Sequence, residues 1–184
     1  MNLIGLTGLA RAGKDSVADL LQAKHGFVKY AFAKPLKDGV KVMFGLTDDH
    51  VYGHLKEVIH PLYGVSPRQM MQWAGTEFGR SLVNPNCWII RAGQAYDILE
   101  HDAYGMVISD VRFENEADFI RQRGGMIVHI SRKAADAIKM DHASEGGVVP
   151  MTGDWFIDNN GSIDELEFKV DALLNAADDA GLLT

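Results

Sequence analysis

Short hydrophobic runs alternate with amphipathic segments along the 184 residues of the chain. The runs at 3–7, 28–32, 106–110, 126–130 and 154–158 have the length and apolar content of strands whose two faces are both buried in a parallel sheet. The segments between them carry helical periodicity or helix start signals. This alternation predicts a three-layer α/β fold with a mostly parallel, five-stranded sheet.

The helices are defined by apolar spacing and by capping residues. They are predicted from the glycines after the first strand to near Gly26, and at 34–44, 67–80, 85–100, 114–121 and 163–177. Ser66 and Ser162 are the predicted N-caps, because Gln or Glu follows three positions after each of them. Residues 50–63 fit no clear pattern. Residues 132–153 mix charges, Gly and Pro without periodicity, which predicts a mobile lid.

Charge and composition limit the partners that the chain can have. A net charge of -7 disfavours long nucleic acid, whereas small phosphorylated ligands need only a few donors. Cys87 is the only cysteine, which excludes an internal disulfide and fits a reducing compartment. No segment has the length of a membrane span and no leader is visible, so we expect a cytoplasmic protein without a membrane partner. We expect one domain over residues 1–184, with a homodimer as an open option.

The segment Gly8-Leu9-Ala10-Arg11-Ala12-Gly13-Lys14-Asp15 lies between the first strand and the first helix. Gly8 and Gly13 let the backbone curl, so that successive N–H groups and the start of the helix face one anion. Lys14 then reaches the β- and γ-phosphates of a nucleotide. The pattern predicts a phosphate-binding loop, and hence a P-loop NTPase fold, with Gly8, Arg11, Ala12, Gly13, Lys14, Asp15 and Ser16 as nucleotide-binding residues. The alternative is a plain strand-to-helix turn with a solvated lysine.

Asp15 departs from the usual loop pattern, in which Ser or Thr follows the lysine and binds magnesium. Asp15, Ser16 and Asp110 are therefore the candidate Mg²⁺ ligands. Asp15 could also position the acceptor, or only favour the positive end of the helix. Asp110 ends the third hydrophobic run, at the carboxyl end of a predicted strand, where open α/β sheets have their ligand crevice. Arg112 follows two residues later, although an Asp and an Arg so placed could also form a structural ion pair.

A second set of polar residues follows the helix that starts at Pro67. Arg68, Gln72, Thr76 and Arg80 recur every four residues and share one gently drifting stripe. Guanidinium groups bind phosphate in a bidentate manner, and Gln72 and Thr76 could bond a sugar or a base. The alternative is a solvated polar face opposite the apolar residues of the same helix.

Several segments together resemble the phage deoxynucleoside monophosphate kinases. They are Gly13-Lys14-Asp15-Ser16, Phe32-Ala33-Lys34-Pro35-Leu36-Lys37, Arg68 through Gly75-Thr76-Glu77 to Arg80, Asp110-Val111-Arg112-Phe113 with Asn115-Glu116, and His142-Ala143-Ser144-Glu145. The resemblance implies a P-loop core with a helical acceptor-binding insertion at about 34–100 and a lid at about 132–153. It also implies that Lys14 and the loop amides hold ATP. Lys34, Arg68, Arg80, Trp88 and Arg112 are then candidates for the acceptor site, to which we add Gln72, Thr76 and Asp110.

The predicted reaction is the transfer of a phosphoryl group from ATP, with Mg²⁺, to the phosphate of a deoxynucleoside 5'-monophosphate by in-line attack. Lys14, Asp15, Arg112 and Arg132 are the predicted catalytic residues. One alternative is a kinase of the same fold for another phosphorylated acceptor, such as phosphomevalonate or dephospho-coenzyme A. Another is a nucleotide-binding NTPase module.

Overall fold

A computed structural model describes residues 1–99, 103–136 and 147–183 of the chain. The elements are β1 (Asn2–Thr7), α1 (Lys14–His25), β2 (Phe27–Tyr30), α2 (Lys34–Phe44), α3 (Asp48–Val51), the 3-10 helix η1 (His54–Glu57), α4 (Pro67–Gln72), the π-helix η2 (Trp73–Val83), α5 (Cys87–Asp97), β3 (Gly105–Ile108), α6 (Glu114–Gln122), β4 (Met126–Ser131), α7 (Lys133–Asp136), β5 (Trp155–Asp158) and α8 (Ile163–Asp179). They form two compact units. The first unit comprises Met1–Ala31 and Tyr96–Thr184, and the second comprises Phe32–Ala95.

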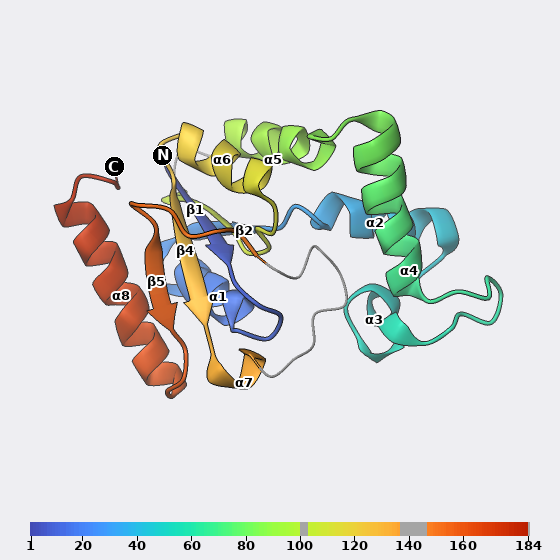
Figure 1. Cartoon of the computed structure of the whole chain (residues 1–184), viewed down its shortest axis with the longest axis horizontal. Helices are drawn as coiled ribbons and strands as arrows, with labels where there is room; N and C mark the ends of the chain where they lie inside the picture. The colour runs from blue at the N-terminus through green and yellow to red at the C-terminus, as the bar shows by residue number, and fades with distance from the viewer. Residues whose placement is uncertain (100–102, 137–146, 184) are drawn as a thin grey trace. The chain divides into compact units, whose positions relative to one another are not determined.

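The first unit contains a five-stranded sheet in the order β2-β3-β1-β4-β5 (Figure 1). Every neighbouring pair of strands is parallel, which confirms the predicted sheet. β1 lies at the centre, because the chain adds β2 and β3 on one side of it and β4 and β5 on the other. In open parallel sheets, ligands bind beyond the carboxyl ends of the strands at such a change of direction.

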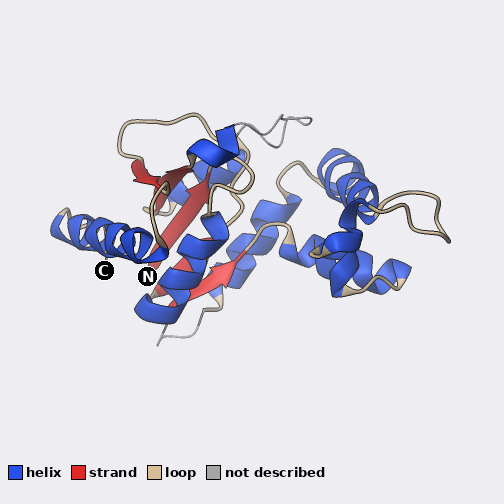
Figure 2. Cartoon of the chain, turned by 90° about the horizontal axis from the view of Figure 1, so that it is seen from below, coloured by secondary structure: helices blue, strands red, loops and turns tan. Residues whose placement is uncertain are grey.

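The alternation of side chains along β1 divides this unit into three layers. Ile4 and Leu6 belong to the hydrophobic core that α1 and α8 close. Gly5 faces the opposite side, where an added Cβ atom would lie 2.5 Å from the Cδ1 atom of Ile120 in α6. The helices α1 and α8 therefore cover one face of the sheet, and α6 covers the other (Figure 2).

The final helix begins as its capping residues predict. The Ser162 Oγ atom accepts a hydrogen bond from the Glu165 N–H (3.2 Å), and the Glu165 carboxylate accepts one from the Ser162 N–H (3.3 Å). This reciprocal pair satisfies two N–H groups that have no partner within the helix. Leu166, Val170 and Leu174 are then buried against the sheet.

The second unit packs α2, α3 and α4 around a small core of its own. The buried side chains of this core are Val40, Leu46, Val51, Met70 and Met71. Ser66 caps α4 as predicted, because its Oγ atom accepts a hydrogen bond from the Gln69 N–H (3.3 Å).

The helix that begins at Pro67 changes type at Trp73, so the prediction of one regular α-helix to about Arg80 is wrong. Gly75 and Gly79 are buried in the π segment, and the Trp88 ring packs so closely on Gly79 that a Cβ atom there would lie 2.7 Å from it. The Trp88 indole N–H also donates to the Gly75 carbonyl (2.9 Å). The wider π-helical turn is favoured because the Trp88 side chain bonds a helix carbonyl and because both glycines have weak α-helical propensity.

Other boundaries differ from the predictions by one to three residues. β2 is shifted from 28–32 because Phe27 already pairs with Gly105, and a turn before α2 begins at Phe32. β3 ends at Ile108, two residues before the predicted end, and Asp110 lies in the turn that follows. α5 begins at Cys87, whose N–H bonds the carbonyl of Asn84, and it ends before the predicted 100.

The predicted lid at 132–153 is described in part. Residues 137–146, which include the motif at 142–145, lie outside the described residues. The segment before them forms α7, a short helix that the sequence pattern did not indicate. The segment after them returns to the sheet, where the Val148 N–H donates to the buried Thr7 Oγ1 atom (3.3 Å) and the Val149 N–H donates to the Glu114 carboxylate (2.8 Å).

A buried carboxylate fixes the end of this returning segment. The Asp154 side chain accepts hydrogen bonds from Arg121 of α6 (2.8 Å), from His129 of β4 (2.9 Å) and from the Met151 N–H (3.0 Å). Burial alone would raise the pKa of Asp154, but these donors, Arg121 and His129 first, outweigh burial and lower the pKa. Asp154 is therefore held as a carboxylate.

Because its pKa is lower in the folded protein, Asp154 stabilises the fold above its unfolded pKa of about 3.9, and this contribution is lost as the pH falls through and below that value. We expect Asp154→Asn to lower the free energy of unfolding at pH 7 by about 1.5–3 kcal/mol, the range for a hydrogen bond to a charged group. Denaturant unfolding between pH 7 and pH 3 should also show a weaker pH dependence in the variant. Asp118→Asn is the control, since Asp118 is exposed and lies 3.6 Å from the same Arg121. An equal loss in both variants would contradict the assignment.

Candidate active site

The carboxyl edge of the sheet gathers most of the predicted site residues of the first unit. The loop after β1 leads into α1, the turn after β3 carries Asp110 and Arg112, and Arg132 follows β4 directly. Because all five strands are parallel, these segments leave the sheet at the same edge. The structure therefore brings Lys14 near Asp110 and Arg112, which follow it by 96 and 98 positions in the sequence.

The loop from Gly8 to Gly13 depends on backbone that only glycine adopts easily. Gly8 has a φ of 140°, and a Cβ atom on it would lie 2.2 Å from the carbonyl oxygen of Ile130 in β4. Gly13 has a φ of 105° at the N-cap of α1, and a Cβ atom on it would lie 2.1 Å from the side-chain nitrogen of Asn159. Both glycines thus permit close approach as well as the curl of the loop.

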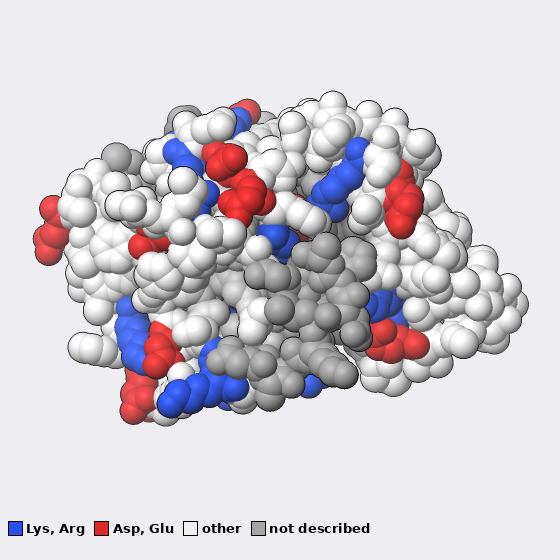
Figure 3. Space-filling view, in the orientation of Figure 1, with Lys and Arg blue, Asp and Glu red and all other residues white. Residues whose placement is uncertain are grey.

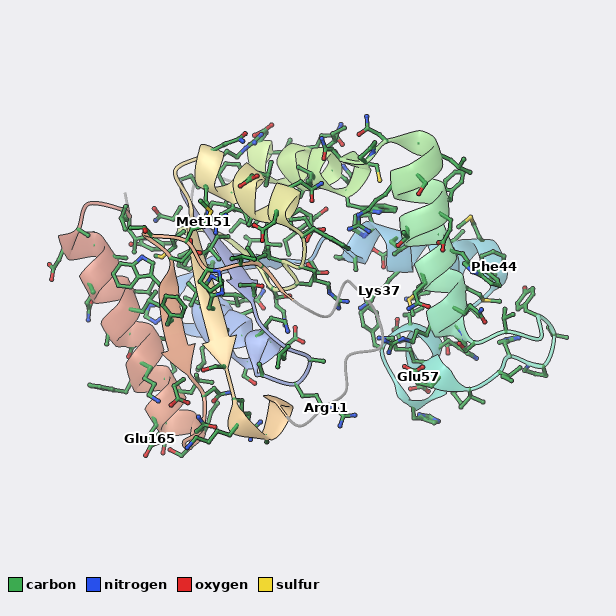
Figure 4. The ribbon with its side chains drawn as sticks, viewed as in Figure 1. Arg11, Lys37, Phe44, Glu57, Met151 and Glu165 are labelled. Carbon is green, nitrogen blue, oxygen red and sulfur yellow. The ribbon has the colours of Figure 1, made fainter. Side chains whose placement is uncertain are left out.

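Arg11 also has a positive φ, of 65°, and is the one non-glycine residue with this conformation among the described residues. Its side chain is exposed and extends outwards from the loop (Figure 4). Ala12 is buried, and its N–H donates to the Leu9 carbonyl (3.2 Å). The loop is therefore a closed turn with a buried base and an exposed cation at its tip.

Lys14 folds back over this loop. Its Nζ atom donates to the carbonyl oxygens of Gly8 and Leu9, each at 2.8 Å. Burial and then the nearby Arg112 guanidinium lower the pKa of Lys14, whereas the carboxylates of Asp15 and Asp110 act to raise it. An ammonium group has three donors, so one N–H remains for an anion that enters the loop.

Asp15 is exposed and bonds a cation on β2. Its Oδ1 atom lies 3.0 Å from the Nζ atom of Lys29, which also bonds Asp19 at 2.8 Å. Burial would lower the pKa of Lys29, but the two carboxylates outweigh it and raise the pKa. Ser16 is half-buried in the first turn of α1. Lys29 therefore fixes where the Asp15 carboxylate lies at the start of the helix.

The turn after β3 is held by two neighbouring strands and by α6. The Ser109 N–H donates to the Tyr30 carbonyl of β2 and the Val111 N–H to the Leu6 carbonyl of β1. The buried Glu116 carboxylate then accepts from the N–H groups of Arg112 (2.8 Å) and Phe113 (3.2 Å). These bonds fix the backbone on both sides of Asp110 and leave the Arg112 side chain exposed.

Arg132 is exposed and follows the last residue of β4. The backbone on its two sides is tied to the turn after β5, because the Ser131 carbonyl accepts from the Asn159 N–H and the Lys133 N–H donates to the Asn160 side chain, both at 2.8 Å. Arg132 thus leaves the sheet at the same edge as the loop after β1.

The remaining predicted residues belong to the second unit. Lys34 pairs with Asp38 (2.7 Å), which raises its pKa, and Arg68 pairs with Glu57 (2.8 Å). Arg80 donates to the Gly75 carbonyl at 3.5 Å, the same oxygen that the Trp88 indole bonds.

The predicted polar stripe runs across the change of helix type at Trp73. Arg68 and Gln72 keep the α-helical spacing, whereas Thr76 and Arg80 lie in the π segment, where hydrogen bonds span five residues instead of four. A residue four positions further along lies on nearly the same side of either type of helix, so the shared stripe stays a prediction. Trp88 contributes to the packing of this helix, which is the ordinary role of a tryptophan.

Three residues important to the site were not predicted. Lys29 holds Asp15, Glu116 holds the turn at Arg112, and Asn159 contacts the loop at Gly13. Glu116 had a usable signal, since it stands three residues after Phe113 at the spacing of a capping box. Lys29 and Asn159 had none, because their partners are distant in sequence.

Acidic and basic side chains are interspersed on the face of the molecule shown in Figure 3. Among the described residues on that face, lysines and arginines do not join into one continuous band.

The model of the deoxynucleotide monophosphate kinase family matches residues 2–58 and 47–170 of the chain. The chain belongs to this family. Membership confirms the predicted enzyme class, a phosphotransferase, and the resemblance on which that prediction drew.

Two viral proteins illustrate the relationship. A mimivirus protein (Acanthamoeba polyphaga mimivirus) named provisionally as a deoxynucleotide monophosphate kinase is 36% identical in the aligned region, which covers 72% of this chain and 75% of that protein. The deoxynucleoside-5'-monophosphate kinase of Escherichia phage T5 is 28% identical in the aligned region, which covers 79% of this chain and 84% of that protein.

Solved structures agree on the fold. Shikimate kinase from Aquifex aeolicus superposes with a TM-score of 0.55 at 15% identity, and the match covers 94% of this chain and 96% of that one. This likeness confirms the predicted P-loop kinase fold. Within the part of the chain that the structure describes, no helix combines the length and hydrophobicity that crossing a membrane requires.

The close approach of Gly8 to β4 leads to a testable prediction about stability. Gly8→Ala should lower the free energy of unfolding by roughly 2–4 kcal/mol, because the added Cβ atom meets the Ile130 carbonyl in a conformation that L-residues avoid. Gly124→Ala is the matched control, with a φ of 71° and nothing within 4 Å of the added atom, and should cost about 1–2 kcal/mol. Denaturant unfolding of both variants measures the difference. Equal costs would show that the approach to Ile130 does not constrain the loop.

Proposed function

We propose that this member of the family transfers the γ-phosphoryl group of ATP to the phosphate of a deoxynucleoside 5'-monophosphate. The observation that carries the proposal is the loop between β1 and α1, where Lys14 folds over two carbonyls and two glycines admit the curl. A helix N-terminus with such a loop binds phosphate through backbone N–H groups. The names of the viral relatives give the class of acceptor.

Nucleotide binding would use the loop residues Gly8, Arg11, Ala12, Gly13, Lys14, Asp15 and Ser16. The Lys14 ammonium would contact the β- and γ-phosphates with its remaining donor, while the amides at the start of α1 face the same oxygens. The lowered pKa of Lys14 stays compatible with a charged side chain, because a bound triphosphate adds negative charge beside it.

The residues present fit a magnesium ion that is bound chiefly by the nucleotide. Mg²⁺ in kinases takes one or two protein carboxylates together with phosphate oxygens and water. No group of three or more acidic, histidine or cysteine side chains that could hold a metal occurs among residues 1–99, 103–136 and 147–183. Asp110, Asp15 and Ser16 are the oxygen donors that we assign to it, and the ion would neutralise charge on the phosphates.

Transfer itself needs alignment and charge neutralisation more than covalent chemistry. Lys14, Arg112 and Arg132 would stabilise the phosphoryl group in transit, and Asp15, held by Lys29, would orient the metal or the acceptor. Lys34, Arg68, Gln72, Thr76, Arg80 and Trp88 remain our candidates for the acceptor site, together with Asp110 and Arg112. Arg68 and Arg80 would bind the acceptor phosphate.

A coupled assay of ADP release across deoxynucleoside and nucleoside monophosphates tests the reaction. We expect ADP release that depends on a deoxynucleoside monophosphate, and a Lys14→Ala variant that folds but loses roughly 10²–10³-fold in kcat, since a donor to the transferring group is removed. Lys24→Ala is the control on the same helix, where the lysine pairs with Glu167 in α8. ATP hydrolysis that no acceptor stimulates, or normal turnover by Lys14→Ala, would refute the proposal.

Acceptor binding can be tested separately. Arg68→Ala should raise the KM for the monophosphate roughly 10–100-fold and leave the KM for ATP unchanged, because one charge-assisted contact to phosphate is lost. Arg91→Ala is the matched control, an exposed arginine of α5 that bonds Gln94 (3.2 Å). Steady-state kinetics with each substrate varied in turn give both constants. An unchanged KM for the monophosphate would remove Arg68 from the acceptor site.

A further inference from the structure

The turn after β5 contacts the loop after β1 through one buried side chain. The Asn159 Nδ2 atom donates to the carbonyl oxygen of Ala12 at 2.8 Å, and Asn159 is 9% exposed. The same amide nitrogen occupies the space into which a side chain at Gly13 would extend. Asn159 therefore contacts the two residues that immediately precede Lys14.

The direction of this hydrogen bond matters for the loop. A trans peptide is planar, and its C=O and N–H groups point in opposite directions. Because Asn159 binds the Ala12 oxygen, the N–H of Gly13 in the same peptide points away from Asn159. One side-chain donor thus sets the orientation of a backbone N–H at the entrance to α1, where the N–H groups have no partner within the helix.

Asn159 is itself held in place from several sides. Its N–H extends the pairing of β5 with β4 by donating to the Ser131 carbonyl (2.8 Å). The Asn160 side chain accepts a hydrogen bond from the Lys133 N–H, and Gly161 leaves no room for a side chain beside Glu165, which closes the cap of α8. The turn is therefore held by contacts within the chain, as preorganised donors require.

We propose that Asn159 is a positioning residue for the donor nucleotide: it orients the Ala12–Gly13 peptide so that the Gly13 N–H faces the phosphates. The inference rests on the proposed function, because it assigns the loop to ATP. Asn159 contacts the loop backbone and acts through it on the nucleotide. Its loss should weaken ATP binding and leave binding of the acceptor unchanged.

Calorimetric titration of ATP and Mg²⁺, together with both KM values, tests this role in two variants. Asn159→Ala removes the donor without adding charge, and Asn159→Asp keeps the shape but places an acceptor against the Ala12 carbonyl. Both should raise the Kd and the KM for ATP roughly tenfold or more, with the KM for the monophosphate unchanged. If Asn159→Asp fails to fold, Asn159→Ala alone carries the test.

Asn2→Asp is the matched control for general destabilisation. Asn2 is 4% exposed and its amide donates to the Tyr104 carbonyl (3.0 Å), at the opposite end of β1 from the loop. The Asn2→Asp substitution should lower the Tm about as much as the Asn159 substitutions do, without changing the Kd for ATP. The inference is overturned if neither Asn159 variant weakens ATP binding, if Asn159→Asp alone does so, or if Asn2→Asp weakens it equally. Failure of the wild-type protein to bind ATP would instead refute the proposed function.

Discussion

The first turn of α1 begins with backbone N–H groups that have no partner inside the helix, and the site is organised around them. They lie after the central strand, at the edge where all five parallel strands end. The curl that aims them needs positive φ at Gly8, Arg11 and Gly13, which is unfavourable for an isolated chain. Contacts from elsewhere in the fold must therefore hold the loop in this shape.

Those contacts come from β4 and from the turn after β5, which both lie on one side of β1. Gly8 lies against the carbonyl of Ile130 in β4, and Gly13 lies against Asn159 after β5. On the other side, the turn after β3 is fixed by bonds to β2, to β1 and to the buried Glu116. The loop and the Asp110–Arg112 turn are thus positioned by the same sheet register, so a shift in strand pairing would displace both together.

Local signals explain what could be read from the sequence. The glycine spacing around Lys14, the capping boxes at Ser66 and Ser162, and the apolar runs depend on residues a few positions apart, and the loop, both helix starts and all five strands were predicted from them. The π segment was not predictable in this way, because the Trp88 donor that bonds Gly75 lies thirteen residues away on another helix. The roles of Lys29 and Asn159 were not predictable for the same reason, because only the folded sheet brings them to Asp15 and Ala12.

The charges near Lys14 show how a protein of net charge -7 could bind the polyanion that the proposed function requires at this edge. Two carboxylates, Asp15 and Asp110, act on the Lys14 ammonium, but Lys29 bonds Asp15. Burial and then the nearby Arg112 guanidinium lower the pKa of Lys14. Local cations therefore offset local carboxylates, and the oriented backbone dipoles of α1 add to the positive side. Because a small anion responds to donors within a few ångströms and solvent screens more distant charges, this local balance decides binding, and the acidic surface elsewhere has little influence on it.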